Sequence, residues 1–192
     1  MTNSSLIKVI LIIGFILGLG LFATYGPTRS VLIYSSVYCL IAINEIVHSL
    51  MRQIHRKRMF TKTQARAKEL NKPLMVIGDP NNGDSSKLLG ARYGCGDVCV
   101  DLTGCPQCPN TIKAKLPNGL EGTEDNSHVV FLSYVLEYVD DYKNAIEEIK
   151  RVGGENVYAL TLSPYQLTAY LYKGSKNVFF KNPFSIKKRQ FG

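Results

Sequence analysis

Residues 9–25, VILIIGFILGLGLFATY, contain no charged side chain. Together with Leu6 and Ile7, this apolar stretch approaches the roughly 20 residues that a helix needs to cross the core of a bilayer. A cleaved signal peptide is the alternative. Only one Lys precedes the stretch, however, and the stretch exceeds the usual signal-peptide core of about 7–15 residues. We therefore expect residues 6–25 to form a transmembrane helix.

A second apolar stretch follows a turn at residues 26–30. It runs from 31 to 43 and continues to 50 after an interruption by Asn44 and Glu45. A carboxylate deep in the hydrocarbon costs about 2.5–3.5 kcal/mol, although Glu45 is close enough to one end to reach the interface. Two arrangements stay open. Residues 31–50 are either the returning span of a hairpin or a helix on the membrane surface, and either way residues 1–51 form the membrane anchor.

Basic side chains dominate residues 52–72, directly after the apolar stretches, and Glu69 is the only acid among them. We treat residues 52–71 as a basic juxtamembrane segment, which carries much of the net charge of +8. The positive-inside rule then predicts that the rest of the chain faces the cytosol. Anionic lipid headgroups are the expected partners, at about 1 kcal/mol per basic residue. Nucleic acid is less favoured because Phe60 is the only aromatic available to stack on bases.

From residue 72 to residue 192, short apolar runs alternate with turn-formers and a helical pattern, which predicts one α/β domain with a mostly parallel sheet. The expected strands cover residues 74–77, 98–100, 111–116, 128–132, 157–162 and 178–180. The expected helices begin after Ser85 and Ser86, after Asp140 and Asp141, and at Gln166. Gly153 and Gly154 are expected to end the second of these helices.

Three segments carry a resemblance to a known family. They are GDPNNG after the first expected strand, DLTGCP at the end of the second, and residues 115–164 with the motif VVFLSYVLEYV and a GG turn. In this order they resemble the class I S-adenosylmethionine-dependent methyltransferases of the type-11 kind. The resemblance covers residues 73–164, about half the chain. It implies an incomplete Rossmann-like sheet with flanking helices, preceded here by one or two transmembrane helices.

The resemblance also implies a site for S-adenosylmethionine at the carboxyl ends of the strands, where ligands of open α/β sheets bind. An acid that closes the second strand of such a unit can accept hydrogen bonds from ribose hydroxyls, which is the role expected of Asp101. Leu116 would lie near the adenine. The complete set of implied cofactor-binding residues is Gly78, Asp79, Gly83, Asp101, Leu116, Ser133 and Tyr134.

No catalytic residue is assigned, because methyl transfer from a sulfonium mainly requires a correctly positioned acceptor. That acceptor is expected to be a small molecule or a lipid-associated group. His128 opens a buried strand and is expected to be structural, and Glu137 is equally compatible with a solvated helix position.

The sequence also allows a second hypothesis, in which the protein belongs to a different functional class. Val76 stands where family members carry an acid, and Pro80 and Asn82 replace glycine-like positions. A proline lacks the N–H group that would face a ligand. These residues favour a catalytically inactive relative that serves as a scaffold, or as a structural protein of a membrane or virion.

Four of the five cysteines lie close together in the sequence, in the pattern C-x3-C-x5-C-x2-C from Cys95 to Cys108. Four thiolates can close a tetrahedral zinc site, but only Cys105 and Cys108 have a customary ligand spacing. Zinc, disulfides and reduced thiols are all open. The expected cytosolic location favours reduced thiols, and no metal is assigned.

Overall fold

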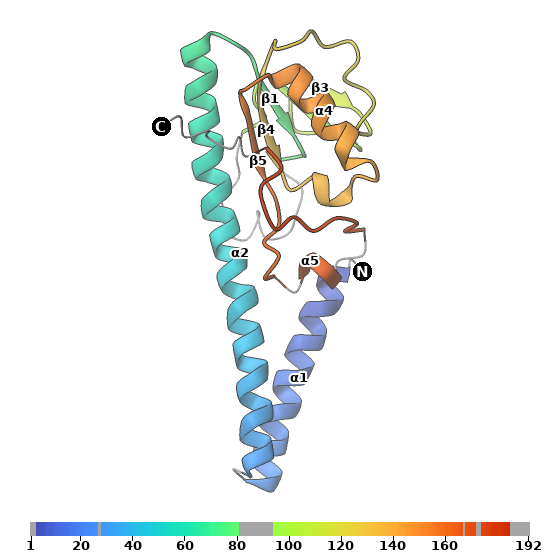
Figure 1. The fold of residues 1–192 in the computed structure, drawn as a ribbon. Helices are drawn as coiled ribbons and strands as arrows, with labels where there is room; N and C mark the ends of the chain where they lie inside the picture. The colour runs from blue at the N-terminus through green and yellow to red at the C-terminus, as the bar shows by residue number, and fades with distance from the viewer. Residues whose placement is uncertain (1–2, 27, 81–93, 167, 172–173, 185–192) are drawn as a thin grey trace, which may run out of the picture.

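The computed structural model describes residues 3–26, 28–80, 94–166, 168–171 and 174–184. Two long helices form a hairpin, and the longer one continues along an α/β layer structure (Figure 1). The helices are α1 (Asn3–Tyr25), α2 (Arg29–Leu70), η1 (Leu136–Tyr138), α4 (Tyr142–Gly153) and α5 (Thr168–Leu171). The strands are β1 (Leu74–Ile77), β2 (Val98–Asp101), β3 (Thr111–Lys113), β4 (Val129–Ser133) and β5 (Val157–Leu160).

The hairpin is held together where two glycines of α1 meet α2. A Cβ atom at Gly14 would lie 2.2 Å from Cε1 of Tyr38, and one at Gly18 would lie 3.5 Å from Oγ of Ser35. Small residues four positions apart let two helices approach closely, which is a common packing mode in membranes. The sequence contains this pattern at Gly14 and Gly18.

Helix α2 is a single helix of 42 residues that contains both the second apolar stretch and the basic segment. It runs unbroken through the boundary expected at residue 51. It ends where Asn71 adopts a left-handed conformation, with φ of 50°, and donates its N–H to Lys68. Among the described residues, α2 from Val31 onward is the one helix long and apolar enough to cross a membrane, and its apolar window is not buried in the protein.

The five strands form one sheet in the order β3-β2-β1-β4-β5, and every neighbouring pair is parallel. This order matches the first five strands of the doubly wound dinucleotide-binding fold, whose switch point lies between β1 and β4. The structure confirms the mostly parallel sheet expected from the sequence. β3 is shorter than expected because Ala114 and Leu116 leave the strand and join the core on one face of the sheet.

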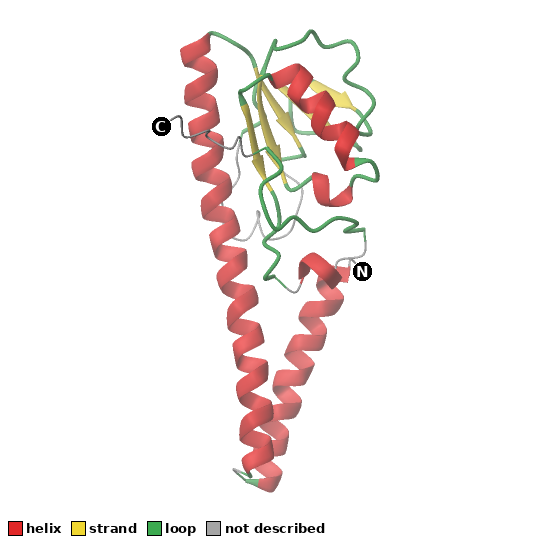
Figure 2. Cartoon of the chain, in the orientation of Figure 1, coloured by secondary structure: helices red, strands yellow, loops and turns green. Residues whose placement is uncertain are grey.

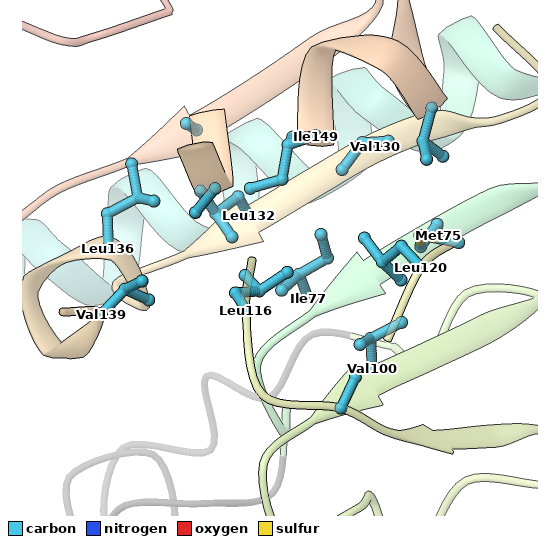
Figure 3. Packing of buried hydrophobic residues seen from close by; sticks show 14 residues of the cluster. Met75, Ile77, Val100, Leu116, Leu120, Val130, Leu132, Leu136, Val139 and Ile149 are labelled. Atoms are coloured by element: carbon cyan, nitrogen blue, oxygen red, sulfur yellow. The ribbon is translucent and has the colours of Figure 1, made fainter. Parts of the chain in front are cut away.

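Alternate residues of each strand pack on opposite faces of the sheet. On β1, Met75 and Ile77 belong to the core under α4, whereas Leu74 and Val76 belong to the core under α2. Figure 3 shows the α4 side, where Ile149 meets the side chains of β4. The basic segment of α2 therefore forms one of the two layers that cover the sheet.

The C-terminal part differs from the sequence expectation. Residues 178–180 are not a strand; Phe179 instead packs edge-on against the ring of Tyr142 at 5.4 Å, and Phe180 is exposed. Loops make up most of the described chain after β5 (Figure 2). Helix α4 does begin as expected, because the Asp141 side chain accepts a hydrogen bond from the Asn144 N–H at 3.2 Å. The helix expected after Ser85 and Ser86 lies outside the described residues.

Three hydrogen bonds fix the direction of the sheet against α2. Arg66 Nε donates to Asn156 just before β5 (3.2 Å), and Arg56 Nε donates to Oγ of Ser133 at the carboxyl end of β4 (3.0 Å). Asn44 Nδ2 donates to the carbonyl of Tyr165, beyond the carboxyl end of β5 (3.3 Å). The strands therefore run antiparallel to α2, and their carboxyl ends face its apolar half (Figure 1).

Candidate functional site

The carboxyl ends of β1 and β2 bring three of the expected site residues together. Asp101 Oδ2 accepts the backbone N–H of Asp79 at 3.1 Å, and Gly78 donates its N–H to the Val100 carbonyl at 2.8 Å. Gly78 has φ of 102°, a conformation that side chains rarely tolerate. This accounts for a glycine at the strand end. Gly83 lies outside the described residues.

The Asp101 carboxylate is half-buried and keeps acceptor capacity. Its Oδ1 accepts both the N–H and the hydroxyl of Thr103, at 2.9 Å each. A carboxylate offers about four lone-pair sites, and the three donors among the described residues occupy three of them. Asp101 thus joins the two turns and still has room for a ligand hydroxyl.

Ser133 and Tyr134, at the end of β4, contact the basic side chains of α2. The Arg56 guanidinium carbon lies 4.9 Å from the centre of the Tyr134 ring, and that of Arg52 lies 5.9 Å away. Tyr134 has a left-handed φ of 55°, uncommon for a bulky residue and frequent at functional sites. From the sequence, both arginines were expected to contact anionic lipid headgroups. Their spacing of four residues, which places them on one helix face with Thr63, was the signal available for this contact.

Leu116 is buried on the α4 side of the sheet. It belongs to the same core cluster as Ile77 and Val100, and Figure 3 shows it beside Ile77 near the end of β1. Its role beside an adenine stays a prediction. Its burial makes it part of the core as well.

Glu137 is only 1% exposed, which excludes the solvated position that the sequence left open. Its Oε1 accepts the Leu162 N–H, and its Oε2 has no hydrogen-bond partner within the described part of the chain. Burial raises the pKa of this carboxyl, opposed by the hydrogen bond from Leu162 and by the nearby charges of Arg52 and Arg56. The backbone carbonyl of Glu137 also accepts the N–H of Lys176, so η1 ties the end of β4 to the C-terminal segment.

His128 lies just before β4, at the amino edge of the sheet and opposite the candidate site. Its Nδ1 is 2.8 Å from the hydroxyl of Ser127. Burial lowers the pKa of the imidazole. This placement agrees with a structural role.

Replacing Arg56 by alanine should lower the free energy of unfolding by about 1–3 kcal/mol. The change removes a charged hydrogen bond to Ser133 and the cation–π contact with Tyr134. Thermal unfolding of the full chain in detergent measures the effect. Lys57→Ala is the matched control, because Lys57 is exposed and should change stability by less than about 0.5 kcal/mol. Equal decreases in the free energy of unfolding of the two variants would contradict a specific role for Arg56.

The four clustered cysteines form two disulfides, Cys95–Cys108 and Cys99–Cys105, rather than the reduced thiols that were favoured. They meet because Cys99 points from β2 toward the α2 side, where the turn from 105 to 108 folds back over the sheet. That turn is closed by a hydrogen bond from the Cys108 N–H to the Cys105 carbonyl at 2.9 Å.

Two pockets lie outside this site. One, of about 350 Å³, is lined by Leu40, Ile41, Asn44, Tyr165, Gln166 and Tyr170, between the apolar half of α2 and the chain after β5. The other, of about 290 Å³, lies at the amino edge of the sheet beside Met75 and His128. Neither is lined by the expected cofactor residues. The pocket of about 350 Å³ is mainly apolar and lies beyond the carboxyl end of β5.

No known protein family, curated protein or solved structure matches this chain. The function has to be inferred from the geometry and the sequence pattern.

Proposed function

We propose that this chain is a membrane-anchored, S-adenosylmethionine-dependent methyltransferase-like protein. The observation that carries the proposal is the Asp101 carboxylate at the end of β2, joined to the turn after β1 in a parallel sheet of order 3-2-1-4-5. In such sheets the nucleoside part of a ligand binds at this edge, and an acid in this position accepts ribose hydroxyls.

The residues present fit such a ligand in two respects. Gly78 leaves the strand end without a side chain, so a ligand can approach the backbone there. Asp101 keeps a lone pair for a ribose hydroxyl, and Asp79, Leu116, Ser133 and Tyr134 would border the same edge. The bound cofactor would supply an electrophilic methyl group, and the chain would position the acceptor in line with it.

The helices support a membrane hairpin with both ends on the cytosolic side. The 23 residues of α1 extend about 35 Å at 1.5 Å per residue, enough for a hydrocarbon core of about 30 Å. Lys57, Arg58 and Lys62 remain exposed on α2 and would contact anionic headgroups. The carboxyl edge of the sheet faces the apolar half of α2, which favours a lipid-associated acceptor over a freely diffusing one.

An inactive scaffold is the second candidate, and specific contacts favour it. Val76 stands at a position where methyltransferases of the resembled family carry an acid, and it is fully buried in the core under α2. The Ser133 hydroxyl is held by Arg56, and three donors already occupy the Asp101 carboxylate. These contacts would hold the fold together in a protein that binds no cofactor.

Calorimetric titration of S-adenosylhomocysteine into the full chain, held in lipid nanodiscs, separates the two candidates. We expect saturable binding with a dissociation constant in the micromolar range. A folded protein that gives no heat up to millimolar ligand would contradict the methyltransferase-like site and leave the scaffold. Circular dichroism on the same sample establishes that the protein is folded.

A further inference from the structure

Three cysteine sulfurs lie in one compact cluster at the β2 side of the sheet, and a fourth is bonded to one of them. The Sγ atoms of Cys99, Cys105 and Cys108 are all within 4.8 Å of one another, and Cys95 is bonded to Cys108. Cys99 and Cys105 are almost completely buried, and Cys108 is 8% exposed. Residues from a strand, a preceding loop and a following turn thus converge on one point.

These three sulfurs are about as close together as the ligands of a tetrahedral thiolate site. Zinc binds thiolate sulfur at about 2.3 Å, so four tetrahedral ligands lie about 3.8 Å apart. The Sγ atoms of Cys99, Cys105 and Cys108 lie within 4.8 Å of one another, and Cys95 reaches them through its bond to Cys108. Cys105 and Cys108 have the C-x2-C spacing typical of zinc ligands, on a turn that the Cys105 N–H anchors to Oγ of Thr111 at 2.8 Å.

We propose that Cys95, Cys99, Cys105 and Cys108, in their reduced state, bind one zinc ion. Reducing the two disulfides takes four electrons and four protons from a cytosolic thiol reductant and gives four thiols. Zn²⁺ then displaces up to four thiol protons, and four Zn–S bonds form. The inference rests on one element of the proposed function, the cytosolic location of the α/β domain, because disulfides are rare in the cytosol. It does not depend on methyl transfer.

The zinc would be structural and would support the candidate site. Cys99 lies two residues before Asp101 in β2, and Cys105 follows the turn in which Thr103 binds the Asp101 carboxylate. All four protein ligands are cysteines, which leaves no open position for a substrate and is typical of structural zinc. Binding would fix the connection from β2 to β3.

The test is the metal and thiol content of the full chain, purified anaerobically in detergent without chelator or added reductant. We expect one zinc per chain by elemental analysis. After denaturation with a chelator, we expect all five cysteines to react as free thiols. A chain without zinc would overturn the proposal. In that case a single reactive thiol, Cys39, would indicate two disulfides, and five would indicate a metal-free thiol cluster.

Two further measurements identify the ligands. Cys105→Ser should reduce zinc to less than about a tenth of the wild-type content, whereas Cys39→Ser in α2 should leave it unchanged. Replacing zinc with Co²⁺ in the wild-type chain should give the intense visible bands of a tetrahedral cobalt–thiolate site. Full zinc retention in Cys105→Ser, or a cobalt spectrum without thiolate character, would overturn the assignment. S-adenosylhomocysteine binding and membrane orientation are measured in separate experiments. A failure of the proposed function can therefore be distinguished from a failure of the zinc proposal.

Discussion

Replacing Asp101 by alanine is expected to weaken S-adenosylhomocysteine binding about 100-fold. The carboxylate would accept a hydrogen bond from a ribose hydroxyl, and one such bond to a charged group contributes about 1.5–3 kcal/mol, or roughly 10- to 150-fold in affinity. The same change releases the N–H groups of Asp79 and Thr103, so the turns at this edge also lose their shared acceptor. Calorimetry on the full chain in nanodiscs measures the loss.

Asp97 provides a matched control for this variant. Its Oδ2 accepts the N–H of Leu74 at 2.7 Å, so it also joins β1 to β2, but at the amino edge of the sheet. Asp97→Ala should destabilise the fold about as much as Asp101→Ala while leaving ligand affinity within about twofold. Equal losses of affinity in both variants would show that Asp101 acts only through stability.

Replacing Gly14 by leucine is expected to disrupt the packing of α1 against α2. A Cβ at this position would lie 2.2 Å from the Tyr38 ring, so the helices must separate or the ring must leave its site. Overpacking of this kind costs about 1–3 kcal/mol. For a chain of this size, a loss of about 2 kcal/mol lowers the unfolding midpoint by about 4–8 °C. Thermal unfolding of the full chain in detergent measures the shift.

The same helix offers the control for this prediction. A Cβ at Gly20 would meet no atom within 4 Å, so Gly20→Leu should leave the unfolding midpoint unchanged. Adding Tyr38→Ala to Gly14→Leu should recover part of the loss, because it removes the ring that the leucine meets. A midpoint unaffected by Gly14→Leu would contradict the packing of the hairpin.

The strands of the sheet could be predicted because local sequence specifies them strongly. The runs at β1 and β4 are short, apolar except for Ser133 at the end of β4, and bounded by turn-formers, as expected for strands buried on both faces. Helix α4 has a cap at Asp141 and an amphipathic pattern. The region of Asp101 was predictable for the same reason, since it closes one of these strands.

The contacts made by α2 could not be predicted from local sequence. A basic helix beside an apolar stretch is typical of a membrane surface, and only the fold shows that Arg56 and Thr63 face the sheet. Glu137 was similarly ambiguous, because a single carboxylate in a short turn does not reveal whether later segments will cover it. The pairing of the cysteines depends on how the turn at 105–108 folds over β2, a long-range feature that spacing alone does not determine.

The proposed arrangement places the carboxyl edge of the sheet, with the candidate site, toward the membrane. The chain contains no tryptophan, so one introduced tryptophan is a unique fluorescent probe. Tyr165→Trp places it beyond the carboxyl end of β5, where Tyr165 is 79% exposed beside the apolar half of α2. Glu155→Trp places it at the exposed amino edge of the same strand.

The decisive measurement is quenching of each tryptophan by brominated phospholipids in liposomes that contain the full chain. We expect strong quenching at position 165 and little at position 155. Equal quenching at the two positions, or stronger quenching at 155, would contradict a site that opens toward the bilayer.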